Sequence, residues 1–145
     1  MEIFTIGFTK KSAAQFFGAL RERKIEQLLD VRLNNVSQLA GFTKRDDLAF
    51  FVSEICHGLY RHELLLAPTQ PILDRYKKGG GSWHRYEQDF LQLLADRRVE
   101  ERLDRSALEP RTVLLCSEPT AEHCHRRLVV EYLVEKWGDV VAVHL

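Results

Sequence analysis

The sequence has no excess of charge of either sign. Its 21 Lys and Arg residues are matched by 21 Asp and Glu residues, so the formal net charge is zero at pH 7. A neutral chain has no global electrostatic field that would hold it to nucleic acid or to an anionic membrane. Any affinity for a polyanion must therefore come from a local group of cationic side chains.

Long apolar runs are also missing from the sequence. No stretch approaches the roughly 18 apolar residues of a membrane-spanning helix, and Met1–Phe4 leads directly into a strand-like segment instead of a basic-then-apolar leader. We therefore expect a cytoplasmic protein with no membrane partner. The three cysteines are an odd number for 145 residues, which argues against the disulfide framework of a small secreted domain.

The sequence does contain short apolar segments that alternate with helical patterns. The predicted strands cover residues 2–8, 27–32, 59–62, 111–116 and 140–145. Short strand–helix–strand connections are typical of βαβ units, in which the strands run parallel. The strands are continuously apolar, as in sheets that helices cover on both faces. We predict one α/β domain over residues 1–145, a three-layer sandwich with a mainly parallel central sheet of about five strands.

Capping residues and the spacing of apolar residues predict the helices. The helices follow Ser12, cover residues 44–57 and 82–98, and run from about 121 to 137. Ser12 and Ser82 are suitable N-caps, and Gly58 suits a C-terminal cap. The charges between residues 96 and 111 balance locally, which predicts a solvated connection. The glycine-rich segment 77–82 is either a plain surface loop or the hinge of a lid.

The last predicted helix is the most informative part of the chain. An apolar strand stops at Cys116, and a helical pattern begins a few residues later, so the N–H groups of the helix point at the space beyond the strand. Helical angles place His125 and Arg126 among the apolar residues, whereas Arg127 faces Glu131 at the surface. A buried Arg needs an anionic partner. The candidates for this partner are Asp30, Glu118 and a ligand.

Polar residues also follow the first two strands. Ligands of open parallel sheets bind beyond the carboxyl ends of the strands, where Thr9, Asp30 and Arg32 are expected. Asp30 and Arg32 lie on the same face of the sheet, so they either pair with each other or take part in chemistry. Asn34 and Asn35 belong to the loop that follows, in the position where α/β proteins place functional loops.

Cys116 has two interpretations. A thiol at a strand end, facing a helix N-terminus and close to His and Arg, has the surroundings that lower a thiol pKa and make a nucleophile. Alternatively, it is a buried structural thiol. The C-x5-R signature of cysteine phosphatases is absent, because Glu122 is the sixth residue after Cys116.

The other two cysteines carry weaker signals. Helical angles put Cys124 on the polar side of its helix, which disfavours both a metal site of Cys116, Cys124 and His125 and a redox pair of the two cysteines. Their spacing also differs from the C-x-x-C of dithiol motifs. We therefore assign no metal ligand. Cys56 is expected to be a small packed hydrophobe.

Taken together, these motifs resemble the domain of unknown function 488 family, a group of small bacterial and archaeal α/β proteins. The resemblance rests on Thr5–Gly7, Asp30–Arg32, Leu115–Glu118, Cys124–Arg126 and His144–Leu145. One branch of the family is closest, through Arg32–Asn35, Ser37–Phe42, Leu66–Thr69, Trp83 and Tyr86–Glu87. Where the family commonly has His and Ser after the glycine of the first strand, this chain has Phe8 and Thr9. The resemblance implies an α/β fold and a site at the shared motifs, in a family without an established activity.

Our leading hypothesis is an enzyme that acts on an anionic, phosphate-bearing substrate, such as a nucleotide or a nucleic-acid end. The candidate catalytic residues are Asp30, Cys116, Glu118 and His125. The candidate anion-binding residues are Thr9, Arg32, Asn34, Asn35 and Arg126. Two alternatives stay open: a non-catalytic binding or regulatory module for nucleic acid or another ligand, which would use the loop 33–43 and residues 83–86, and a thiol or metal sensor. The sequence identifies no cofactor.

Overall fold

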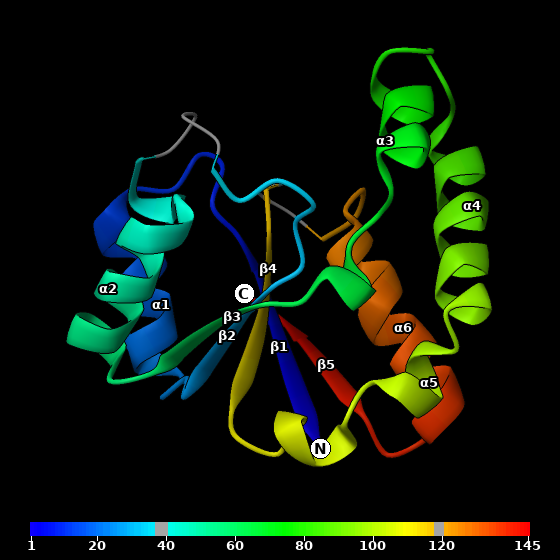
Figure 1. The fold of residues 1–145 in the computed structure, drawn as a ribbon. Coiled ribbons are helices and arrows are strands. Elements are labelled where there is room, and N and C mark those ends of the chain that lie inside the picture. The colour runs from blue at the N-terminus through cyan, green and yellow to red at the C-terminus, as the bar shows by residue number, and fades with distance from the viewer. Residues whose placement is uncertain (37–40, 118–120) are drawn as a thin grey trace.

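The computed structural model describes residues 1–36, 41–117 and 121–145. Its centre is a five-stranded sheet with the strand order β3-β2-β4-β1-β5 (Figure 1). The strands are β1 (Glu2–Gly7), β2 (Gln27–Asp30), β3 (Leu59–His62), β4 (Thr112–Cys116) and β5 (Val141–His144). Every neighbouring pair of these strands is parallel. The predicted α/β fold with a parallel sheet of about five strands is therefore confirmed.

Helices cover both faces of this sheet (Figure 1). One face carries α1 (Ala13–Glu22) and α2 (Arg45–Cys56), and the other carries α3 (Gln70–Lys77), α4 (Trp83–Asp96), α5 (Val99–Arg102) and α6 (His125–Trp137). Each face buries its own apolar cluster. Phe16, Leu20 and Leu48 belong to the first, and Phe90 and Leu128 belong to the second. This arrangement confirms the predicted three-layer sandwich.

The strand order brings the carboxyl ends of β1, β2 and β4 together. Gly7 at the end of β1 pairs with Cys116 at the end of β4, and Asp30 at the end of β2 pairs with Leu115. The apolar run Val113–Leu115 is fully buried, which fixes β4 in the middle of the sheet. The polar residues that follow these three strands consequently lie along one edge of the sheet.

The helix ends show where local sequence was a good guide. Ser12 and Ser82 cap α1 and α4 with side-chain hydrogen bonds, as predicted. The C-terminal cap of α2 was predicted wrongly, because His57 rather than Gly58 takes the left-handed conformation, with a φ of 53°. Gly58 instead provides space: a Cβ there would lie 3.0 Å from the carbonyl oxygen of Glu26. The glycine thus permits close approach of two chain segments.

The segment between α4 and β4 was predicted to be a solvated connection, and most of its charged side chains are indeed exposed, but the segment is more structured than predicted. It forms α5 and a short 3-10 helix, Arg105–Leu108, which bury Val99, Leu103 and Leu108 in the core. Three well-spaced apolar side chains are enough to hold a charged segment against the sheet. None of the helices in the described ranges combines the length and the apolar character needed to cross a membrane.

Candidate functional site

A cavity of about 260 Å³ opens at the carboxyl ends of β2 and β4. Its lining falls into three groups. Arg32, Leu33 and Asn34 follow β2, whereas Cys116, Ser117, His123, Cys124 and His125 come from the end of β4 and the start of α6. The third group belongs to α3, α4 and the chain just before them: Pro68, Leu73, Tyr76, Lys77, Trp83 and Tyr86. Three stretches of the chain that are distant in sequence therefore meet around this cavity.

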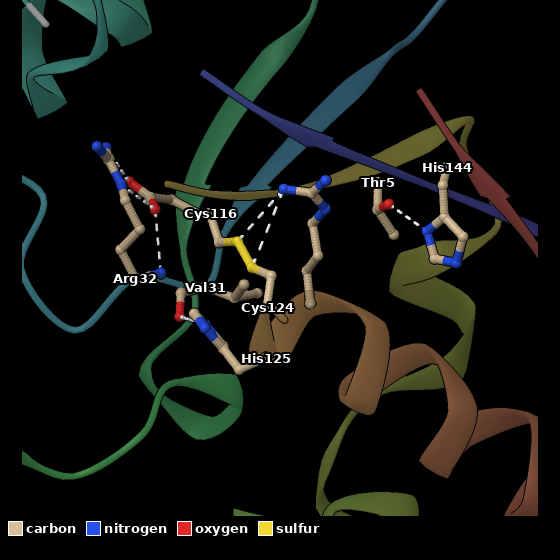
Figure 2. Close-up of a disulfide and its surroundings, with 9 residues drawn as sticks. Thr5, Val31, Arg32, Cys116, Cys124, His125 and His144 are labelled. Atoms are coloured by element: carbon tan, nitrogen blue, oxygen red, sulfur yellow. Dashed lines mark hydrogen bonds and ion pairs between the residues drawn. A yellow bond between two sulfur atoms is a disulfide. The ribbon is translucent and has the colours of Figure 1, made fainter. Parts of the chain in front are cut away.

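Cys116 and Cys124 form a disulfide beside this cavity (Figure 2). Both residues are buried, with exposed fractions of 1% and 3%. The predicted orientation of Cys124 is wrong, because α6 begins at His125 and not near residue 121. Cys124 is the N-cap, with an extended backbone at φ −135° and ψ 139°, so helical angles do not apply to its side chain. The objection to a pairing of these two cysteines therefore disappears.

Arg126 approaches both sulfur atoms of the disulfide. It is fully buried, as its helical angle predicted, and its Nη1 atom is 3.5 Å from Sγ of Cys116 and 4.0 Å from Sγ of Cys124. The charge of Arg126 also acts further along the sheet edge: after burial, it is the second cause that lowers the pKa values of Lys11 and His144. The region around the cysteines is therefore electropositive.

His125 is held in one tautomer. Its Nε2 atom lies 2.7 Å from the carbonyl oxygen of Val31, and because a carbonyl only accepts, Nε2 must carry the proton (Figure 2). Burial lowers the pKa of His125 to about 4; the bond to Val31 opposes this shift, and the charge of Arg126 adds to it. The imidazole is consequently neutral at pH 7, with its lone pair on Nδ1.

Asp30 and Arg32 pair with each other, which was one of their two predicted roles. Arg32 donates from Nε and Nη2 to the two carboxylate oxygens at 2.8 and 2.7 Å, and both side chains are almost fully buried. Tyr60 donates to the same carboxylate at 2.6 Å, and this bond, after burial, raises the pKa of Tyr60. Arg32 also donates to the carbonyl of Thr43. Asp30 thus accepts hydrogen bonds on both oxygens.

The two arginines do not converge on one point. The Arg32 side chain extends away from the disulfide (Figure 2), whereas Arg126 contacts the sulfur of Cys116. Of the three candidate partners of Arg126, Asp30 is therefore excluded, since it binds Arg32 and Tyr60. The other protein partner predicted for Arg126, a glutamate at position 118, lies outside the described residues.

The predicted site residues separate into two groups. Four of them line the cavity: Arg32, Asn34, Cys116 and His125. Four others lie elsewhere at the same edge: Thr9, Asp30, Asn35 and Arg126. Thr9 donates its backbone N–H to the carbonyl of Ser117 at 3.0 Å, and Asn35 donates its side-chain amide to Tyr60 at 3.1 Å. These two contacts support the loops around the cavity.

The family model described as "Domain of unknown function DUF488" matches residues 12–133. The chain belongs to the DUF488 family. The matched region contains the ends of β2 and β4, the α3 and α4 helices and the first turns of α6, so the cavity of this DUF488 protein is built from the part that defines the family. No curated protein and no solved structure matches the chain.

Sequence reasoning gave too little weight to the aromatic side of the DUF488 cavity. Tyr76, Trp83 and Tyr86 form a cluster in which Trp83 and Tyr86 stack with ring centroids 5.3 Å apart, and His123 stacks on Trp83 at 5.0 Å. Trp83 and Tyr86 were considered as part of a contact segment, but an ordinary amphipathic helix was the better explanation of their spacing. The available signal was the neighbouring glycine-rich turn, which places α3 beside α4.

Arg127 attaches α4 to α6, and its predicted role as surface decoration is incomplete. It lies 3.7 Å from the carboxylate of Glu131, as expected, but it also binds Glu87 of α4 at 3.0 Å. Its guanidinium lies over the ring of Trp83, 5.8 Å from the centroid. These contacts hold the aromatic cluster in place at the side of the cavity.

Proposed function

We propose that this DUF488 protein binds and acts on a small anionic, phosphate-bearing substrate that contains a planar ring, such as a nucleotide. The observation that carries the proposal is the meeting of an aromatic cluster and a helix N-terminus in one cavity. A nucleotide carries an aromatic base and an anionic phosphate joined through a sugar, and the cavity has one surface that suits the base and another that suits the phosphate.

The aromatic surface suits a base. Tyr76 and Tyr86 have ring centroids 4.9 Å apart, and Trp83 stacks on Tyr86, so several ring faces and edges lie together at the cavity. Bases stack on such side chains with little preference for sequence. The volume of about 260 Å³ is near the lower end for small-molecule sites, which favours one base over a duplex.

The anionic part would lie at the start of α6. This helix has 13 residues, its N-terminal residues line the cavity, and its first turn contains no acidic side chain. Cys124 at the N-cap makes no side-chain capping bond. The positive end of the helix dipole therefore faces the cavity, where it attracts a phosphate. Lys77 adds a cation from α3.

Binding can be tested by isothermal titration calorimetry with inorganic phosphate, mononucleotides and short single-stranded oligonucleotides. We expect Trp83→Leu and Lys77→Ala to weaken nucleotide binding by about tenfold each, the effect of losing one stacked ring or one phosphate contact. Lys78→Ala is the matched control, because Lys78 pairs with Asp74 and is not part of the cavity. The proposal fails if wild type binds none of these ligands, or if the control variant loses as much affinity as Lys77→Ala.

A binding module without catalysis is the second candidate. The observation in its favour is that both oxygens of Asp30 accept hydrogen bonds from Arg32 or Tyr60, which makes this carboxylate a poor general base. Incubation of each bound ligand with the protein, followed by mass spectrometry of the ligand, distinguishes an enzyme from a non-catalytic binding module. An unchanged ligand after prolonged incubation with reduced protein supports the module, and a product that disappears in Cys116→Ser or His125→Gln supports the enzyme.

A further inference from the structure

Three side chains of the kind that bind soft metal ions meet beside the cavity. They are Cys116 from the end of β4, and Cys124 and His125 from the start of α6. One potential ligand atom from each lies within 4.8 Å of the other two, and all three residues line the cavity. Two thiolates and one imidazole, with a fourth position left open, are a ligand set found in catalytic zinc sites.

We propose that Cys116, Cys124 and His125, once the two cysteines are reduced, bind a thiophilic divalent cation of the zinc class, with the fourth coordination position facing the cavity. The ligands come from two rigid elements, a central strand and a 13-residue helix, which fixes their relative positions. In a tetrahedral zinc site, with metal–sulfur bonds of about 2.3 Å, the sulfur atoms need only separate by side-chain rotation.

The surroundings of the three ligands also fit a metal. His125 donates its Nε2 proton to the carbonyl of Val31 at 2.7 Å, which leaves the lone pair of Nδ1 for coordination. Metal-binding histidines typically make such a bond with their second ring nitrogen. Arg126 Nη1 approaches both sulfur atoms, at 3.5 and 4.0 Å, and a nearby guanidinium favours the thiolate form that a metal requires.

The lining of the cavity predicts what would occupy the fourth position. Lys77 and the N-terminal residues of α6 line the same cavity, so a cation and the positive end of the helix dipole lie close to the three ligands. Together with the divalent cation itself, they favour an anionic fourth ligand, such as hydroxide or phosphate. In this respect the inference deepens the proposed function and rests on it, because the metal would receive the anionic group of that substrate. Metal binding itself does not require the substrate.

The oxidation state of the cysteines would control the site. A dithiol reductant breaks the bond between Cys116 and Cys124, gives two electrons and two protons to the sulfur atoms, and becomes a disulfide itself. The metal then binds as the two thiols release their protons. The disulfide form has no thiolate to offer, so oxidised protein cannot form the three-ligand site.

The test starts from purified protein reduced with a phosphine, which takes an oxygen atom from water, becomes the phosphine oxide and adds no competing thiol. After treatment with a chelator, the protein receives Zn²⁺ or Co²⁺. We expect one Zn²⁺ per reduced chain by elemental analysis, and with Co²⁺ a thiolate-to-cobalt charge-transfer band and intense tetrahedral absorption. Cys116→Ser and Cys124→Ser should lose the charge-transfer band, and His125→Ala should bind Co²⁺ at least about tenfold more weakly.

Cys56→Ser is the matched control, because Cys56 on α2 is the remaining cysteine and does not line the cavity. It should bind Co²⁺ as wild type does. Since a cysteine variant can fail to fold, alkylation of the wild type gives a second readout: Zn²⁺ should protect Cys116 and Cys124, but not Cys56, from iodoacetamide. The inference is overturned if reduced wild type binds no stoichiometric metal, or if Zn²⁺ leaves the alkylation of all three cysteines unchanged.

The cavity variants separate this inference from the proposed function. Trp83→Leu and Lys77→Ala should keep wild-type Co²⁺ spectra, because neither residue belongs to the ligand set. If nucleotides fail to bind while Co²⁺ binds normally, the proposed function fails alone. If nucleotides bind to metal-free protein and Co²⁺ does not bind, the metal site fails alone.

Discussion

At the scale of single residues, burial decides the protonation of His125. Its pKa falls from 6.5 to about 4, chiefly because the ring is removed from water. Between these two pH values the unfolded chain binds a proton that the folded chain does not. The free energy of unfolding must therefore decrease as the pH falls through this window, and the contribution is fully present above pH 6.5.

We therefore expect His125→Gln to lose less stability than wild type when the pH is lowered from 6.5 to about 4. Glutamine keeps a side-chain N–H donor but does not titrate. Urea unfolding at a series of pH values measures the difference. His84→Gln, which replaces an exposed histidine of α4, should follow the wild-type pH dependence. Identical curves for His125→Gln and wild type would show that this histidine does not govern the effect.

At the scale of elements, local chemistry predicted most of the fold. The strands were recognisable because helices cover both faces of the sheet, which requires continuous apolar runs such as Val113–Leu115. Ser12 and Ser82 marked helix starts because a hydroxyl at the N-cap satisfies an N–H of the first turn. These features depend only on neighbouring residues. Once the strands and helices were predicted from them, the edge of the sheet that carries the cavity could be predicted as well.

The interior of the site could not be derived in the same way. The direction of the Cys124 side chain depends on an extended backbone at one N-cap position, and helical periodicity does not contain that information. Asp30 and Arg32 had two possible roles, and the hydroxyl of Tyr60 from a neighbouring strand decided between them. Trp83 and Tyr86 became cavity residues only through the packing of α4 against α3.

The contact between α4 and α6 predicts how firmly α3 and α4 are held to the rest of the protein. Arg127 reaches from α6 to Glu87 and to the ring of Trp83, so Arg127→Ala should loosen α3 and α4 from the rest of the protein. Because the ion pair is partly exposed, the loss in stability should stay below about 1 kcal/mol. Faster amide hydrogen exchange in residues 77–82 is the expected local effect.

Arg85→Ala is the control for this exchange experiment, because Arg85 pairs with Asp89 within α4 and makes no bridge to α6. Its exchange in residues 77–82 should match wild type. Equal acceleration in the two variants would mean that the helices respond to any lost surface charge and that Arg127 does not attach them.

For the molecule as a whole, the net charge and the size of the cavity both bear on the proposed nucleotide ligand. The chain is neutral, with an isoelectric point near 7.0, so it has little general attraction for a polyanion. The proposed site offers a small number of positive groups in a cavity of about 260 Å³. In the proposed function, a ligand with one base and one phosphate group would use these features, whereas a long nucleic acid would extend beyond them.

The salt dependence of binding therefore distinguishes a nucleotide site from a nucleic-acid surface. In the proposed complex, Lys77 and the start of α6 would supply about two phosphate contacts. The slope of log K against log salt should therefore be shallower than roughly −2, and similar for a mononucleotide and an oligonucleotide. Fluorescence anisotropy with labelled ligands at increasing salt measures both slopes. If the oligonucleotide binds with a slope steeper than roughly −4, and Trp83→Leu leaves that slope unchanged, its contacts lie on a surface outside the cavity.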